Sequence, residues 1–177
     1  MARISGNNGD NRLTGTSASD VIEGFSGRDT LTGNGGNDVL RGGSGSDIIR
    51  DNAGRDLIKA GEGNDTIING TGNDSIDGGS GNDIIIDGSG NDLILPGPGR
   101  DTLVFNFDRS GDINFIDGFS AGVDTVDIPN SASRSFSSSS DGDILFTYSN
   151  NASIVGIEFN GIDNTSFNVQ NVNNSIV

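Results

Sequence analysis

A nine-residue pattern repeats without interruption over more than half of the chain. From Gly6 to Val104, 99 of the 177 residues divide into eleven consecutive blocks of nine, with no insertion or deletion. Self-similarity at a fixed short period predicts a solenoid, in which each repeat packs only against its neighbours. This period therefore constrains the fold more than any other property of the sequence.

Three positions of the block are nearly constant along the repeat. Position four is Gly in every block except the second, which has Ala18, and position eight is a large aliphatic residue from Leu13 to Leu103. Position six is Asn11 in the first block and Asp in the ten that follow: Asp20, Asp29, Asp38, Asp47, Asp56, Asp65, Asp74, Asp83, Asp92 and Asp101. Three coinciding columns exclude a chance effect of composition.

Each part of the block favours one type of backbone. Positions seven to nine are β-prone, and alternation along a strand turns the position-eight aliphatic to the face opposite its neighbours. Positions one to six are rich in Gly, Ser, Asn and Asp, which favour turns. We therefore expect strand and turn to alternate, with two blocks in each coil and the position-eight side chains inside.

Composition excludes several classes of function. The formal net charge is −15, which argues against nucleic acid and against anionic membrane surfaces as partners. The chain has no His and no Cys, so a Ser-His-Asp centre, a histidine or thiolate zinc site and a disulfide framework cannot form. The ligands that remain for a metal are carboxylate and carbonyl oxygens.

The aspartate columns point to a cation. Alternate blocks of the expected coil stack about 4.8 Å apart, and like carboxylates about 5 Å apart repel by roughly 3 kcal/mol per pair at an effective dielectric near 20. Sites made only of carboxylate and turn carbonyl oxygens suit Ca²⁺ better than Mg²⁺. A metal-free glycine-rich solenoid is the alternative interpretation.

The blocks resemble the RTX (hemolysin-type) calcium-binding nonapeptide, Gly-Gly-x-Gly-x-Asp-x-U-x with U a large aliphatic, most closely at Gly42 to Arg50 and Gly78 to Ile86. The resemblance implies an all-β fold, a right-handed parallel β-roll over residues 1–104, with an antiparallel β cap over 105–177. It implies about eight or nine Ca²⁺, each held between a loop and the loop two blocks later. The first two turns depart most from the motif, so we expect them to bind most weakly.

The resemblance also implies which residues bind the metal. These are the ten position-six aspartates with Asn11, and glycines at positions two and four acting through their carbonyl oxygens. The glycines are Gly36, Gly43, Gly45, Gly54, Gly61, Gly63, Gly70, Gly72, Gly79, Gly81, Gly88, Gly90, Gly97 and Gly99.

The C-terminal region reads as a β-rich lid over the open end of the roll. We expect strands at Phe105–Phe107, Ile113–Ile116, Val123–Ile128, Ile144–Tyr148, Ile154–Phe159 and Phe167–Val169, and a flexible loop at Ser131–Ser140. The segment from Phe119 to Ile128 is similar to the one that follows the roll in many RTX proteins, and Asp117 stands before it as a weaker ligand candidate.

Family resemblance implies secretion by a type I exporter that reads an uncleaved C-terminal signal, and therefore an extracellular location. No charged and apolar signal stretch follows Met1, and the tail that ends in Ser-Ile-Val is compatible with such a signal or with a frayed terminus. Calcium-coupled folding outside the cell would then make the chain a structural and secretion-assisting module.

We expect no catalysis. A His-Glu-x-x-His helix and a Gly-Lys-Ser/Thr phosphate loop are missing from the sequence, and Ser44 and Ser80 of the repeats do not stand in a Gly-x-Ser-x-Gly elbow. Metal binding explains the paired carboxylates better than glycoside hydrolysis.

Position seven of the odd blocks suggests a contact surface. It forms a row of Thr and Ile side chains at Thr30, Ile48, Thr66, Ile84 and Thr102. The alternatives are packing of the lid, self-association, and binding to a polysaccharide, ice or another solid surface. The second functional interpretation is therefore a binding module that presents this face.

Overall fold

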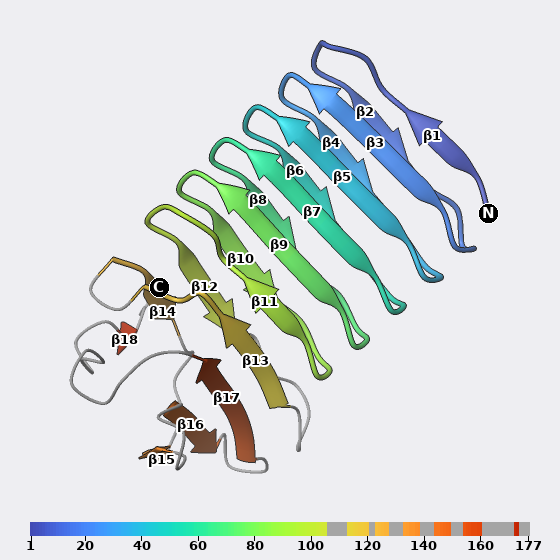
Figure 1. Cartoon of the computed structure of the whole chain (residues 1–177). Helices are drawn as coiled ribbons and strands as arrows, with labels where there is room; N and C mark the ends of the chain where they lie inside the picture. Colours follow the sequence, from blue (N-terminus) through green and yellow to red (C-terminus); the bar gives the residue numbers. More distant parts are fainter. Residues whose placement is uncertain are drawn as a thin grey trace.

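A computed structural model shows an all-β chain wound into a solenoid of about six turns (Figure 1). The structure describes residues 1–105, 113–120 and 123–127, together with the strand backbones at 133–138, 144–149, 154–160 and 172–173. This described part contains strands and turns without a helix, so it includes none that is long and apolar enough to cross a membrane. The all-β prediction is confirmed.

Two sheets form the walls of the solenoid. The first has ten strands, in the order β1 (Arg3–Ser5), β3 (Val21–Ser26), β5 (Val39–Ser44), β7 (Leu57–Glu62), β9 (Ser75–Ser80), β11 (Leu93–Leu95), β13 (Ile113–Asp117), β17 (Ile154–Asn160), β16 (Ile144–Ser149) and β15 (Ser133–Ser138). The second has eight, in the order β18 (Val172–Asn173), β14 (Thr125–Asp127), β12 (Thr102–Phe105), β10 (Ile84–Asp87), β8 (Thr66–Ile68), β6 (Ile48–Arg50), β4 (Thr30–Thr32) and β2 (Arg12–Thr14).

The register of the sheets follows from the nine-residue block. Within the repeats, paired strands are parallel and partners are two blocks apart, as in Leu40 opposite Ile58 and Ile49 opposite Ile67. Successive blocks therefore alternate between the two sheets, and a shift of one residue would turn the whole aliphatic column outward. The predicted coil of two blocks is confirmed.

The position-eight side chains form the core. From Ile22 to Leu103 all ten are 0% exposed, while Leu13 is only partly buried against them. Phe105, Ile116, Phe119 and Val126 continue the same cluster beyond the repeats. Each buried aliphatic contributes about 1.5 to 3 kcal/mol to folding, so the column supports the narrow roll along its length.

Parallel pairing continues past Val104. Strand β13 pairs with β11, β14 with β12, and β17 with β13, all in parallel. Among the strands that the structure describes, β16 and β15 are the antiparallel ones at this end of the first sheet. The C-terminal strands thus extend the walls of the roll before the antiparallel part begins.

One expectation for the C-terminal region is wrong. Ser133–Ser138 is strand β15, paired antiparallel with β16, where the serine run predicts a flexible loop. An adjacent strand supplies the backbone hydrogen bonds, and this pairing overrides the weak β-propensity of Ser. The strand expected at Phe167–Val169 and the terminal Ser-Ile-Val lie outside the described residues.

Candidate metal sites

The position-six residues form two columns, one at each edge of the roll where the chain turns from one sheet to the other. The Asp20 edge carries Asp20, Asp38, Asp56, Asp74 and Asp92, and the Asp29 edge carries Asn11, Asp29, Asp47, Asp65, Asp83 and Asp101. The ten aspartates are between 1% and 4% exposed. We use "gap" for the space between two turns stacked two blocks apart.

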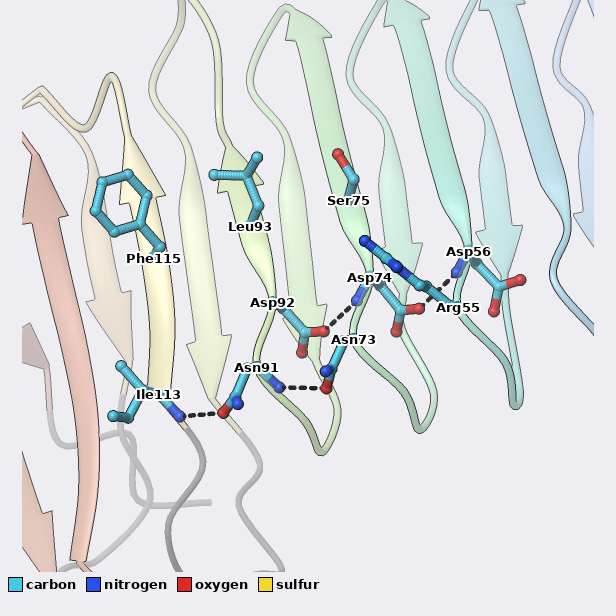
Figure 2. Close-up of a pocket in the computed structure, with 10 residues that line it drawn as sticks. All are labelled: Arg55, Asp56, Asn73, Asp74, Ser75, Asn91, Asp92, Leu93, Ile113 and Phe115. Atoms are coloured by element: carbon cyan, nitrogen blue, oxygen red, sulfur yellow. Dashed lines mark hydrogen bonds between the residues drawn. The ribbon is translucent and has the colours of Figure 1, made fainter.

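One oxygen of each carboxylate joins adjacent turns. The backbone N–H of Asp47 donates to Oδ1 of Asp65 at 2.7 Å, and the same bond runs from Asp74 to Asp92 at 2.7 Å (Figure 2). Along both columns these bonds measure 2.5 to 3.0 Å. A charge-assisted bond to a backbone donor fixes the orientation of each carboxylate.

The second oxygen faces into the gap. Eight aspartates bury Oδ2 without a hydrogen-bond partner: Asp29, Asp38, Asp47, Asp56, Asp65, Asp74, Asp83 and Asp101. An uncompensated buried carboxylate oxygen is strongly unfavourable. The same oxygen is left without a partner along both columns, and a cation beside it would compensate its charge.

The first members of the columns are satisfied differently. Oδ2 of Asp20 accepts hydrogen bonds from the backbone N–H and the hydroxyl of Thr16, and Oδ1 of Asn11 accepts from the N–H of Asn7. At the other end, Oδ2 of Asp124 accepts from the N–H of Ser120. Within the two columns, the eight unsatisfied oxygens therefore belong to interior members, while the first members and Asp124 are satisfied by their own turns.

The pKa values also differ between the interior aspartates and Asp20, the first member of its column. Burial raises the pKa of Asp47 and Asp74 to about 6 and that of Asp83 to about 7, with a further contribution from the neighbouring carboxylates of each column. Backbone hydrogen bonds from Ala2 and Thr16, with the Thr16 hydroxyl, instead lower the pKa of Asp20. Without a cation, these three interior carboxylates are held in an environment that disfavours their charge.

Backbone carbonyls of one turn lie close to the glycines of the next. The carbonyl oxygen of Gly45 lies so near Gly63, and that of Gly54 so near Gly72, that a Cβ at either later position would collide with it. Gly63 also has φ of 129°, which side chains rarely adopt. Carbonyls at positions two and four thus pack against the next turn, and the Gly70 carbonyl also accepts the N–H of Ser89 at 3.0 Å.

Position one contributes further oxygens that the sequence analysis missed. The space beside Gly24 is bounded by Oδ2 of Asp29 and by the carbonyl oxygen of Gly42, and the space beside Gly42 by Oδ2 of Asp47 and the carbonyl of Ala60. Each of these gaps therefore places a position-one carbonyl close to the unpartnered carboxylate oxygen.

The columns also extend beyond the repeats. The N–H of Asp92 donates to Oδ1 of Asn114 at 2.9 Å, and that of Asp101 to Oδ1 of Asp124 at 3.0 Å. These partners are 22 and 23 residues apart instead of 18, so a fixed period does not find them. The signal that could have done so is Asn114 or Asp124 two residues before a buried aliphatic, as in the repeats.

A second ladder lies at position five. The N–H of Asn91 donates to Oδ1 of Asn73 at 3.0 Å (Figure 2), and Arg100 donates to Asn82 at 2.9 Å. These bonds run from the later turn to the earlier one, opposite to the aspartate ladder. They are exposed to solvent and tie the outside of the turns together.

The Thr/Ile row has the expected register. Thr30, Ile48, Thr66, Ile84 and Thr102 lie opposite one another on consecutive strands of the second sheet. Ile48 is 36% exposed and Ile84 is 43% exposed.

An all-β parallel roll with two stacked columns of inward-facing carboxylates defines a repeat protein that holds cations in its turns. The model of the RTX calcium-binding nonapeptide repeat (4 copies) matches residues 5–40, 41–76 and 68–103. The chain belongs to this family, and its β-roll binds Ca²⁺. The expected family membership is confirmed.

Solved structures give weaker similarities. The extracellular lipase LipA from Serratia marcescens is 16% identical with a TM-score of 0.35, and the match covers 98% of this chain and 40% of the lipase. The AlgE6R3 subunit from the Azotobacter vinelandii mannuronan C5-epimerase is 21% identical with a TM-score of 0.32, covering 95% of this chain and 80% of the subunit. A search of curated proteins found no match.

Proposed function

We propose that this chain is a non-catalytic module whose folding is coupled to calcium binding. The observation that carries the proposal is the set of eight buried, unpartnered Oδ2 atoms that face the gaps. A folded roll without cations would bury these oxygens uncompensated, whereas a Ca²⁺ in each gap would compensate them and join two turns. The free energy of calcium binding would then contribute directly to the free energy of folding.

The ions would occupy the gaps between successive column members, from Asn11 and Asp29 to Asp83 and Asp101. This arrangement gives eight or nine ions, with the position-six carboxylates and the carbonyls of positions one, two and four as ligands. Ca²⁺ accepts six to eight oxygens in flexible geometry, which suits a site shared by two turns. The first turns, which depart from the glycine pattern, would bind most weakly.

The physiological consequence would be a switch between compartments. In a calcium-poor cytoplasm the chain would stay unfolded and suited to a type I exporter, and at about millimolar calcium outside the cell it would fold. Dissociation constants of about 10⁻⁴ to 10⁻³ M are sufficient for this switch. The role would be structural and would assist secretion.

A titration followed by far-ultraviolet circular dichroism tests the proposal. Chelator-treated protein is expected to give a disordered spectrum that becomes β-rich with Ca²⁺ but not with Mg²⁺. The readout concerns the whole chain and needs no ligand other than the ion. A β-rich, cooperatively unfolding protein that is indifferent to calcium would contradict coupled folding.

The exposed Thr/Ile row favours a second candidate function, binding to a polysaccharide, to ice or to another copy of the chain. The supporting observation is the in-register alignment of Ile48 and Ile84 with three threonines on one sheet face. Thr66→Lys with Ile84→Lys is expected to abolish surface adsorption or self-association while calcium-induced folding is retained. Unchanged adsorption in the folded double variant would eliminate this candidate.

A further inference from the structure

The two edges of the roll differ at position one of the block. On the Asp29 edge this position is Gly24, Gly42, Ala60, Gly78 and Pro96, none of which has a side-chain oxygen. On the Asp20 edge it begins with Gly15 and Gly33 and continues with Asp51, Asn69 and Asp87. Within the repeat motif these three residues look like simple losses of glycine.

The three polar residues are buried beside the Asp20 column. Asp51 is 2% exposed, Asn69 is 6% exposed and Asp87 is 1% exposed. Oδ2 of Asp51 and Oδ1 of Asp87 lack hydrogen-bond partners. Asp51 uses its other oxygen to accept the N–H of Asn52 at 2.7 Å, and Asp87 accepts from Nδ2 of Asn114 at 2.6 Å. Each therefore keeps one buried carboxylate oxygen for another partner.

Asp51 points into the gap between Asp38 and Asp56. A Cβ at Gly33 would lie 2.6 Å from Oδ2 of Asp38 and 3.5 Å from Oδ1 of Asp51. At Gly15, one turn earlier, the corresponding neighbour is the carbonyl oxygen of Gly33. Asp51 thus places a side-chain carboxylate where the preceding gap presents a backbone carbonyl.

Three carboxylates in this gap can reach one ion. One oxygen from each of Asp38, Asp51 and Asp56 lies within 4.8 Å of the other two. Because Ca–O distances are about 2.3 to 2.6 Å, ligands on opposite sides of one Ca²⁺ are up to about 5 Å apart. Oδ2 of Asp38 and Oδ2 of Asp56 are also buried and unpartnered. Each of the three carboxylates therefore has one buried oxygen without a hydrogen-bond partner.

We propose that the Asp20 edge contains a second, carboxylate-rich class of Ca²⁺ site. It lies in the gap between Asp38 and Asp56, where Asp51 is the third carboxylate ligand. Asp87 holds the equivalent position for the gap between Asp74 and Asp92, and its buried, unpartnered Oδ1 extends the proposal to that gap. This inference rests on the proposed function and adds to it that the two edges bind calcium unequally. A third carboxylate strengthens attraction for a divalent cation, so these two gaps fill before the others.

Isothermal titration of the full chain with calcium chloride, after removal of metal by chelator, tests the proposal. The wild type is expected to bind two ions about tenfold more tightly than the remainder. Asp51→Gly, which restores the residue of most blocks, is expected to remove one tight ion, and Asp51→Gly with Asp87→Gly to remove both.

Asp51→Asn with Asp77→Asn as its control separates ligation from a general effect of charge. Both changes remove one negative charge at nearly constant volume, but Asp77 is half-exposed beside Lys59 at 3.9 Å and outside the gaps. Asp51→Asn is expected to weaken one tight ion and Asp77→Asn to leave both. If Asp51→Gly does not fold, the calcium titration of Asp51→Asn still tests the proposal.

The outcomes separate this inference from the proposed function. If the wild type folds with calcium but its tight ions are unaffected by the Asp51 variants, position one holds no ligand and the inference is wrong while calcium-coupled folding stands. Equal loss in Asp51→Asn and Asp77→Asn would also overturn it. A wild type that binds no calcium would remove the proposed function itself.

Discussion

The backbone N–H of Asp47 donates to Oδ1 of Asp65, 18 residues later, and leaves Oδ2 of Asp65 buried without a partner. The same carboxylate therefore fixes the stacking of two turns and offers an oxygen to a cation. This double use explains why the repeat needs aspartate at position six. Asparagine keeps the first role and removes the charge required for the second.

Asp65→Asn is expected to have opposite effects with and without calcium. The calcium concentration at the folding midpoint should rise by about tenfold, because two adjacent gaps lose a carboxylate. In chelator the variant should show at least as much residual β structure as wild type, because a buried charge is removed from the metal-free roll. Circular dichroism in chelator and during a calcium titration measures both effects, and Asp77→Asn serves as the exposed control. Less β structure in Asp65→Asn than in wild type in chelator would contradict this account.

The metal-free protein is expected to lose stability as the pH rises from about 4 to about 7. Burial raises the pKa of Asp47, Asp74 and Asp83 to between about 6 and about 7, whereas an unfolded Asp titrates near 3.9. In this window the folded state binds more protons, so its stability is full below the unfolded pKa and is lost through the folded pKa. Circular dichroism of the chelator-treated protein between about pH 4 and pH 7.5 measures the change, and a β content that increases with pH would refute it.

Phe25→Gly is expected to stabilise the protein. Phe25 occupies position two with φ of 83°, where the equivalent Gly43 and Gly61 have 120° and 121°. Its side chain is 49% exposed, so little burial is lost, and relief of a left-handed backbone strained by about 1 to 2 kcal/mol should outweigh the entropy of Gly. The free energy of unfolding in saturating calcium should rise by about 0.5 to 1 kcal/mol.

Phe25→Ala is the matched control, because it keeps the Cβ and the strain while removing the ring. It should show no gain in stability. Equal stability of the Gly and Ala variants would mean that the backbone at residue 25 is not strained.

The position-five ladder is expected to contribute modestly to stability. Oδ1 of Asn82 accepts the N–H of Arg100 at 2.9 Å, and Asn82 donates its own N–H to Asn64 at 2.8 Å. Asn82→Ala should lower the free energy of unfolding by about 0.5 to 1.5 kcal/mol. Asn82→Asp, which retains the acceptor, should lose less. Identical losses in urea unfolding would show that the side-chain acceptor is unimportant.

The nine-residue period predicted the regular part of the fold because one physical rule repeats in every block. Position eight must be apolar to fill the core, and the position-six side chain must accept a hydrogen bond from the neighbouring turn. Ile67 and Asp65 could therefore be placed from sequence alone. The rule fails where the spacing changes, and Asn114 and Asp124 were missed although they continue the columns. Ser133–Ser138 was misjudged because its strand depends on a partner, β16, that no local pattern reveals.

Asp51 and Asp87 show a different reason for failure. In a repeating pattern, a block with another residue at a glycine position looks like a weaker copy of the motif. Whether its side chain points to solvent or into the gap depends on the neighbouring turn, which only the stacked structure supplies. Their burial beside the Asp20 column turns an apparent defect into a source of ligand oxygens.

The separation of 18 residues between bonded turns has a mechanical consequence. Force applied to the two ends of the roll acts on its turns in series, so each coil can peel away without disturbing those behind it. Released chain of 18 residues extends by about 60 Å. Under tension the calcium-loaded roll would lengthen in a regular sawtooth, and its last steps would be those held by the tightest ions.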